Sequence, residues 1–222
     1  MHNRQIKDHL YEQVARIGKV LSSAKRLELI EILCQGEFSV ERLAEQAAIS
    51  VRLTSAHLQE LKLAQLVLTR RDGKYIFYRL ADTGVATLWV ALREAAEGRL
   101  SELREAMQGL VTSTDELTPL AGTQLLAMAK RGDIVVIDVR ADGEFVAGHL
   151  PYARSLPLVD LKKRLKILPK NKPIVAYCRG PFCLMAKEAV ALLKQRGYVA
   201  SRSELGVAEW RAQGLPLVVG IH

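Results

Sequence analysis

Apolar residues in the first half of the chain recur every three or four positions, the spacing that places side chains on one face of a helix. This pattern predicts helices over residues 9–21 and 24–34, and a short helix that starts at Ser39. Another helix begins at Ser50, whose hydroxyl can cap its first turn. One side of this helix carries Leu53, His57, Leu58 and Leu61. A long helix over residues 83–107 completes the half.

An alternating pattern follows the Ser50 helix. Residues 66–71 and 74–80 flank Asp72-Gly73, and this dipeptide between alternating segments is a strong hairpin signal. Two short helices, a tight turn and a hairpin form the pattern of a winged helix-turn-helix. The first half is therefore predicted to be a mainly α winged helix-turn-helix domain.

The second half has a different pattern. Residues 134–137 and 174–177 are continuous apolar runs, which suit strands buried on both faces of a parallel sheet. Helical patterns alternate with them, notably over residues 185–195, so this half is predicted to be an α/β domain. A polar stretch separates the halves. The expected organisation is a first domain over 1–107, a linker over 108–118 and a second domain over 119–222.

The charge distribution gives little support to a DNA partner by itself. The net charge is +8 and the pI about 9.5. Residues 1–110 carry only +2 of it, and residues 111–222 carry +6. An argument for DNA binding must therefore rest on local pattern.

Other features of composition indicate a cytoplasmic protein without a membrane partner. No apolar run approaches the roughly 20 residues that span a bilayer, and residues 1–10 are polar and charged. Three cysteines are too few for a disulfide framework, which fits a reducing compartment.

The helix that begins at Ser50 is the predicted recognition helix, since such helices present their N-terminal residues to the major groove. Arg52 has the geometry to read guanine, and the hairpin tip is basic enough to contact phosphates. The candidate DNA-contacting residues are Ser50, Arg52, Thr54, Ser55, His57, Gln59, Arg70, Arg71 and Lys74. By pattern alone a solvated basic domain or a protein-binding helix-turn-helix remains an alternative, and His57 can equally face the core.

Residues 49–80 resemble the ArsR/SmtB family of repressors, through Ser55-Ala56-His57-Leu58 and Tyr78-Arg79-Leu80. The resemblance covers roughly residues 9–105. It implies a repressor that binds a double-stranded DNA operator as a homodimer, paired through helices 9–21 and 83–107. Two positions depart from the family pattern: Ala56 replaces the usual Arg, and Gln65 replaces the usual Gly before the wing, which predicts a changed turn geometry.

The first half has no ligand set for a metal. Residues 37–40, where many relatives place thiols, contain no cysteine, and the last helix has neither His nor Cys. Cys34 is interpreted as a small buried apolar residue. We expect no bound metal and no cofactor.

The second half contains a candidate nucleophile. A predicted buried strand ends at Tyr177, and a helix follows the hexapeptide Cys178-Arg179-Gly180-Pro181-Phe182-Cys183. Amides at a helix N-terminus and the charge of Arg179 favour a thiolate on Cys178, so the loop can cradle an anion beside a nucleophile. The plainer alternative is a buried structural thiol in an ordinary turn.

The surroundings of this loop resemble the rhodanese family over roughly residues 115–220. The matching segments are 136–140, 144–153 and 208–210 followed by 214–216. The resemblance implies that Cys178 carries a persulfide and that Arg179 and the loop amides hold the sulfur donor. Cys183 stands where relatives often have Thr, Ser or Arg, and Leu205-Gly206 replaces a more usual Gly-Gly. The side chains expected to anchor the sheet are those of Asp138, Arg140, Glu144 and His149.

Together these patterns favour a sulfur-responsive repressor, in which a persulfide on Cys178 is attacked or stabilised by Cys183. Two alternatives stay open. One is a sulfurtransferase that acts on a small sulfur donor and a thiol acceptor and carries an accessory DNA-binding domain. The other is a metalloid sensor that uses Cys178 and Cys183 as ligands. Neither the effector nor the direction of its action on DNA follows from the sequence.

Overall fold

The computed structural model describes residues 2–109 and 117–220. The chain divides into two compact units, an N-terminal unit of Met1–Trp89 and a C-terminal unit of Val90–His222. The predicted linker over 108–118 lies mostly outside the described residues. The domain bounds 1–107 and 119–222 therefore stay a prediction.

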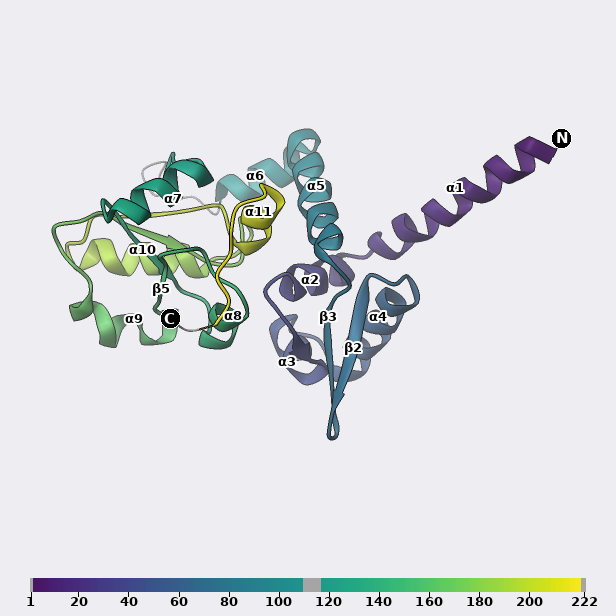
Figure 1. Cartoon of the computed structure of the whole chain (residues 1–222), viewed down its shortest axis with the longest axis horizontal. Helices are drawn as coiled ribbons and strands as arrows, with labels where there is room; N and C mark the ends of the chain where they lie inside the picture. Colours follow the sequence, from purple (N-terminus) through teal and green to yellow (C-terminus); the bar gives the residue numbers. More distant parts are fainter. Residues whose placement is uncertain (1, 110–116, 221–222) are drawn as a thin grey trace. The chain divides into compact units, whose positions relative to one another are not determined.

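The N-terminal unit has the helices and hairpin of a winged helix-turn-helix (Figure 1). Its elements are α1 (His2–Leu21), α2 (Ala24–Leu33), β1 (Phe38–Ser39), α3 (Val40–Gln46), α4 (Val51–Leu63), β2 (Val67–Asp72), β3 (Tyr75–Leu80) and the start of α5 (Thr83–Arg99). The hydroxyl of Ser39 accepts a hydrogen bond from the amide of Arg42, and that of Ser50 accepts one from Leu53. Both helix starts therefore lie where the sequence pattern placed them, with the serine as cap.

The hairpin differs from its prediction by one residue. The strands are antiparallel, in the order β1-β3-β2, and Asp72 pairs with Tyr75. The loop therefore consists of Gly73 and Lys74, and Gly73 adopts the positive φ of 57° that favours glycine in tight hairpin turns.

The turn before the wing contains Gln65, the residue that departs from the family pattern. Gln65 has a φ of 59°, the left-handed conformation that glycine adopts without strain. The amide of Gln65 donates to the carbonyl of Lys62, and that of Leu66 donates to Leu61. The change in turn geometry relative to the family stays a prediction.

Two neighbouring residues on α4 differ in burial from what the sequence pattern predicted. Leu53, expected to pack with the apolar side of the helix, is 44% exposed, whereas Thr54 is fully buried. Thr54 fits an apolar surrounding because its hydroxyl donates to the carbonyl of Ser50, four residues earlier.

The predicted helix over 83–107 is interrupted. It consists of α5, which ends at Arg99, and α6 (Ser101–Gly109). The Arg104 guanidinium donates to the carbonyls of Glu97 and Gly98. These side-chain bonds satisfy carbonyls in the last turn of α5, which explains how the helix can end there.

The C-terminal unit is an α/β structure around a parallel sheet with the strand order β5-β4-β6-β7. Beyond α5 and α6, its elements are α7 (Gly122–Arg131), β4 (Val135–Asp138), α8 (Asp142–Ala147), β5 (Arg154–Ser155), α9 (Leu158–Arg164), the short 3-10 helix η2 (Leu165–Ile167), β6 (Ile174–Tyr177), α10 (Met185–Gln195), β7 (Ala200–Arg202) and α11 (Val207–Ala212).

Both faces of this sheet are covered, as the continuous apolar runs predicted (Figure 1). Val135 and Ile137 of β4 pack on one side with residues of α9 and α10. Val136 packs on the other side with Leu125 of α7 and Trp210 of α11. The sheet therefore presents its strand ends, and not its faces, to ligands.

The polar segment around β4 anchors the sheet, as expected. Asp138 and Arg140 are fully buried and joined by several hydrogen bonds, and the Tyr177 hydroxyl also donates to Asp138. His149 stacks on Phe145 with ring centroids 3.6 Å apart. Within residues 2–109 and 117–220 no helix combines the length and the apolar character that crossing a membrane requires.

Candidate functional site

The candidate nucleophile lies at the carboxyl end of a central strand. Cys178 directly follows β6, and residues 178–183, here called the cysteine loop, lead to α10, which begins at Met185. Since β6 lies between β4 and β7 in a parallel sheet, the loop emerges at the edge where ligands bind in open α/β folds.

The two cysteines of this loop contact each other and the backbone. Cys178 is only 3% exposed, with its sulfur 3.5 Å from the Cys183 carbonyl oxygen, while Cys183 is half-buried. The Cys178 thiol donates to the carbonyl oxygens of Gly180 and Cys183, at 3.9 and 3.5 Å. Backbone hydrogen bonding of Gly180 and Ala186 opposes the rise in the pKa of Cys178, and that of Arg179 and Met185 lowers the pKa of Cys183. The anion cradle stays a prediction.

The acidity of the pair corrects the prediction that Cys178 is the thiolate. The hydrogen bond that Cys178 donates, two backbone amides and the charge of Arg179 lower the pKa of Cys183 to about 6, despite its burial. The hydrogen bond to Cys183, burial and the neighbouring charge raise the pKa of Cys178 well above its ordinary value. These directions favour the thiolate form at Cys183, the more exposed of the two residues, over Cys178.

Arg179 is held by an acidic residue that the sequence pattern had assigned to anchoring alone. Its Nε lies 2.8 Å from Glu144 Oε1 and its Nη2 lies 3.0 Å from Oε2, a bidentate pair. Glu144 is almost fully buried. It therefore fixes the guanidinium beside the cysteine loop, in addition to packing in α8.

The opposite side of the loop is lined by α11. A Cβ built on Gly206 would clash with the backbone carbonyl of Arg179, so only glycine lets the start of α11 approach the loop so closely. The departure Leu205-Gly206 therefore keeps its glycine at the position where the contact is made.

Glu209 of α11 is a site residue that the sequence-based reasoning missed. Its carboxylate accepts a hydrogen bond from the Gly206 amide and lies over Gly180, where an added Cβ would be 3.2 Å from Oε1. In the sequence it falls within 208–210, a segment that resembles the rhodanese family, and nothing in the local pattern separates it from its neighbours. Burial raises the pKa of Glu209, and the charge of Arg93 opposes that rise.

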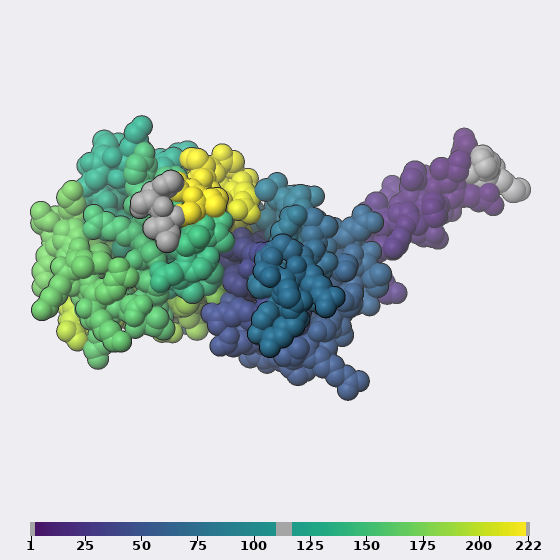
Figure 2. All heavy atoms as spheres, turned by 60° about the horizontal axis from the view of Figure 1, so that its bottom comes forward, coloured from purple at the N-terminus to yellow at the C-terminus, as the bar shows by residue number. Residues whose placement is uncertain are grey.

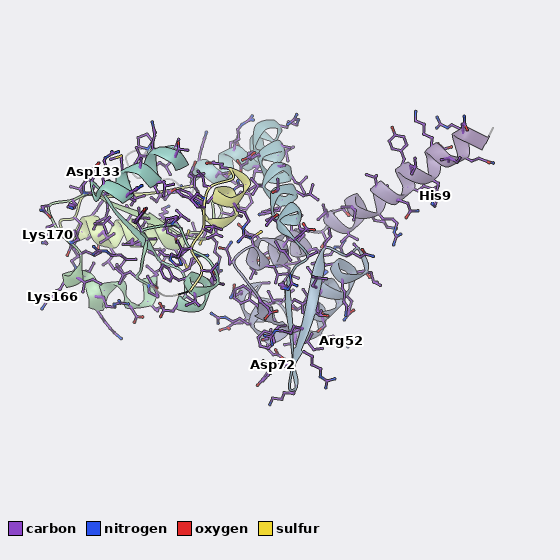
Figure 3. All side chains as sticks on the ribbon, in the orientation of Figure 1. His9, Arg52, Asp72, Asp133, Lys166 and Lys170 are labelled. Atoms are coloured by element: carbon purple, nitrogen blue, oxygen red, sulfur yellow. The ribbon has the colours of Figure 1, made fainter. Side chains whose placement is uncertain are left out.

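The candidate DNA-reading residues of α4 are only partly available. Arg52 is exposed at the start of the helix, and it lies on the same side of the N-terminal unit as Asp72 at the hairpin end (Figure 3). Ser50 and Gln59 are exposed, and Ser55 and His57 are half-buried. Gln59 also donates to the Tyr78 hydroxyl. Thr54 is fully buried and is removed from the candidate DNA-contacting residues.

The basic residues of the hairpin have intramolecular partners. Arg70 forms ion pairs with Glu37 and Asp72, at 2.7 and 3.1 Å, and its guanidinium carbon lies 4.7 Å from the Phe77 ring centroid. Arg71 donates to the Gly73 carbonyl, and the Lys74 ammonium lies over Tyr75. All three side chains are exposed and can exchange these partners for phosphates.

The third cysteine, Cys34, is buried in the core of the N-terminal unit, as interpreted from the sequence. Among the residues that the structure describes, no group of three or more His, Cys, Asp and Glu side chains is placed to hold a metal ion. Cys178 and Cys183 therefore have no third ligand in these parts of the chain.

The fold and the cysteine loop together define a class: a helix-turn-helix regulator joined to a rhodanese-like domain. Residues 122–213 match the model of the rhodanese-like domain. The chain is 37% identical to the HTH-type transcriptional regulator Rv0324 of Mycobacterium tuberculosis, over 95% of this chain and 92% of that protein. It therefore belongs to the family of ArsR-type winged-helix transcriptional regulators with a C-terminal rhodanese-like domain.

Relatives of each half are found separately as well. The HTH-type transcriptional regulator KmtR of the same organism is 41% identical over 34% of this chain and 58% of its own length. A sulfurtransferase of Allochromatium vinosum is 32% identical over 41% of this chain and 84% of its own length.

Proposed function

We propose that this protein is a repressor that binds its operator as a homodimer and responds to reactive sulfur through Cys178 and Cys183. The observation that carries the proposal is that two cysteines share one loop at the carboxyl end of β6, with the Cys178 sulfur 3.5 Å from the Cys183 carbonyl oxygen and Arg179 held beside them by Glu144. A purely structural cysteine needs neither a second thiol nor a fixed cation beside it.

The DNA half of the proposal rests on α4 and the hairpin. Arg52 and Ser55 near the start of α4 face the major groove, and Arg70, Arg71 and Lys74 contact phosphates or the adjacent minor groove. Membership of a family of transcriptional regulators supports this assignment.

The homodimer is supported by α1. Its surface carries exposed apolar side chains at Ile6, Leu10, Tyr11 and Val14, at helical spacing. Figure 2 shows α1, in purple, projecting from the rest of the N-terminal unit. Such a stripe is typical of a surface that packs against another helix, and a second copy of this chain, paired through α1 and the helices after Thr83, would cover it.

The sulfur chemistry starts with the shared proton. Cys178 attacks the terminal sulfur of a polysulfide while its proton passes to the Cys183 thiolate. The S–S bond of the polysulfide breaks, the shortened polysulfide leaves as an anion, and Cys178 becomes a persulfide. Arg179, fixed by Glu144, and the loop amides stabilise the negative charge that gathers at the loop.

The second step closes a ring. Cys183 loses its proton to solvent, and its thiolate attacks the sulfur of Cys178 that bears the outer sulfur. The Cys178–Cys183 disulfide forms and HS⁻ leaves, so two thiols are oxidised and one sulfane sulfur is reduced. Cysteines five residues apart in one loop can meet the short Cβ separation that a disulfide needs.

The test combines two measurements on the full chain. Mass spectrometry follows Cys178 and Cys183 after exposure to inorganic polysulfide, sulfide or thiosulfate, and a gel-shift titration follows DNA affinity on the same samples. We expect polysulfide to modify Cys178 and to change the affinity. Equal affinities for wild type and Cys178→Ser, with and without polysulfide, would overturn the proposal.

A second function is favoured by the similarity to a sulfurtransferase, namely turnover of a small sulfur donor with a thiol acceptor. It predicts steady-state activity with thiosulfate and cyanide that persists in Arg52→Ala and Arg70→Ala variants. Sulfur transfer that stops after one equivalent per chain would favour the sensor over the enzyme.

A further inference from the structure

Arg93 is a buried cation on α5, in the part of that helix that belongs to the C-terminal unit. Its side chain is 4% exposed. Burying a guanidinium costs free energy unless its charge is paired, so the groups next to Arg93 indicate what keeps it in place.

Two carboxylates face this guanidinium. Nη1 lies 3.2 Å from Glu209 Oε1, and Nε lies 3.3 Å from Glu97 Oε1. Neither nitrogen has a partner with hydrogen-bond geometry among the described residues. Arg93 is therefore retained by charge and not by a fixed set of hydrogen bonds, which leaves it able to follow a small displacement of either carboxylate.

Glu209 connects this cation to the cysteine loop. The same carboxylate accepts from the Gly206 amide at 2.9 Å and lies against Gly180 in the middle of the loop. Gly206 in turn packs directly on the carbonyls of Cys178 and Arg179. A change in the path of the loop backbone must therefore displace Glu209.

Phe182 provides a second contact between Arg93 and the loop. Its ring centroid lies 5.9 Å from the Arg93 guanidinium carbon, within the range of a cation–π interaction. Because Phe182 directly precedes Cys183, any movement of Cys183 toward Cys178 shifts this ring. Arg93 thus contacts both the middle and the end of the cysteine loop.

We infer that Arg93 is a positioning residue that couples the chemical state of Cys178 and Cys183 to helix α5, through Glu209 and Phe182. The inference rests on the proposed function for the disulfide that drives it. Helix α5 is the element that can carry the signal, since its residues 83–89 belong to the N-terminal unit and Val85, Ala86 and Trp89 are buried. Coupling of this kind requires both sites to bias one common element.

The experiment uses Arg93→Met, which keeps much of the side-chain volume and removes the charge. Arg99→Met, at an exposed position on the same helix, is the matched control. Three quantities are measured for each protein: modification of both cysteines by mass spectrometry, operator affinity before and after inorganic polysulfide, and hydrogen exchange of peptides from α5.

In wild type and Arg99→Met, we expect polysulfide to change operator affinity by about 5- to 150-fold, the usual range of allosteric coupling. In Arg93→Met the cysteines should be modified to the same extent, while the affinity changes by less than about twofold and exchange in α5 stays constant. A merely structural role of Arg93 would lower cysteine modification or basal affinity instead, and that result counts against the inference.

Glu209→Gln provides a second test if Arg93→Met does not fold. The amide oxygen still accepts from Gly206, but the charge that holds Arg93 is gone, and the response should again be lost. A response equal to that of wild type in both variants would overturn the inference and leave the proposed function intact.

The proposed function can also fail by itself, when polysulfide leaves wild-type DNA affinity unchanged. The disulfide is then formed with diamide, which accepts the two thiol hydrogens. Altered exchange in α5 of wild type, absent in Arg93→Met, still supports the role of Arg93. Unaltered exchange in wild type contradicts it.

Discussion

At the scale of single residues, the chemistry of the cysteine loop depends on which sulfur carries the charge. The sequence predicted that Cys178 is the thiolate, because it follows a strand and precedes Arg179. In the structure the pKa of Cys183 is lowered and that of Cys178 is raised, and Cys183 is the more exposed of the two.

The pKa of Cys183, about 6, gives a pH prediction. Thiolate, the nucleophilic form, is present above that pH and is lost as the pH falls through it. The rate of alkylation of Cys183 by iodoacetamide should therefore rise with a midpoint near pH 6 and be flat above neutrality.

The variants for this experiment replace each cysteine in turn. Cys178→Ala removes the side-chain donor that lowers the pKa of Cys183, so the midpoint for Cys183 should move upward. In Cys183→Ser, the alkylation step with a midpoint near pH 6 should be absent. A midpoint near the ordinary value of 9.0 in wild type would contradict the assignment of the charge.

Gln65 is a second residue whose conformation has a measurable consequence. A non-glycine residue in the left-handed region costs about 1–2 kcal/mol, and glycine relieves most of this cost. We expect Gln65→Gly to raise the free energy of unfolding by about 1 kcal/mol in denaturant titrations. Lys62→Gly, in the helical part of α4, should lower it by a similar amount. Destabilisation by both substitutions would contradict the strain at Gln65.

At the scale of elements, the hairpin arginine Arg70 is paired with carboxylates of the same chain. Glu37, from the segment before β1, and Asp72 both pair with Arg70, and these hydrogen bonds raise the pKa of the guanidinium. A phosphate must displace these carboxylates before Arg70 can contact DNA.

Removing the charge of Glu37 should therefore strengthen DNA binding. Since exposed ion pairs are weak, Glu37→Gln should tighten operator affinity by no more than about fivefold. The slope of log affinity against log salt should steepen by about 0.9 for each further phosphate that the protein neutralises. Glu41→Gln removes the same charge from an exposed position on α3. Operator affinity is measured by fluorescence anisotropy across a salt series. An equal increase in affinity for both variants would exclude a specific effect through Arg70.

At the scale of the whole molecule, the apolar stripe of α1 requires a partner. We expect Leu10→Asp combined with Val14→Asp, at positions 60% and 70% exposed, to convert the dimer to a monomer. Loss of the second half-site should lower operator affinity by at least about tenfold, or 1.4 kcal/mol. Light scattering after gel filtration gives the mass. Gln5→Asp, an exposed position on the side of α1 opposite the stripe, should stay dimeric, and a dimeric double variant would refute this role of α1.

The elements themselves could be predicted from local pattern. Apolar periodicity located α2, α4 and α10, the serine caps located two helix starts, and continuous apolar runs located β4 and β6. Periodicity could not find the end of α5, because Arg104 reaches back to the carbonyls that end the helix. The exposed Leu53 and the buried Thr54 were misplaced because residue type outweighed spacing: Thr54 lies four residues before Leu58 and seven before Leu61, on the buried face of α4.

The sequence by itself determined the order of the two folds, the family and the candidate cysteine loop, because these depend on neighbours along the chain. Only the tertiary structure decided that the pKa of Cys183 is lowered while that of Cys178 is raised, that Glu144 fixes Arg179, and that Arg93 and Glu209 adjoin the loop. Glu144 lies 35 residues before Arg179 and Arg93 lies far before Glu209, so packing alone brings them together. The physical reason is that pKa values and ion pairs depend on distance and burial in space, which no local pattern records.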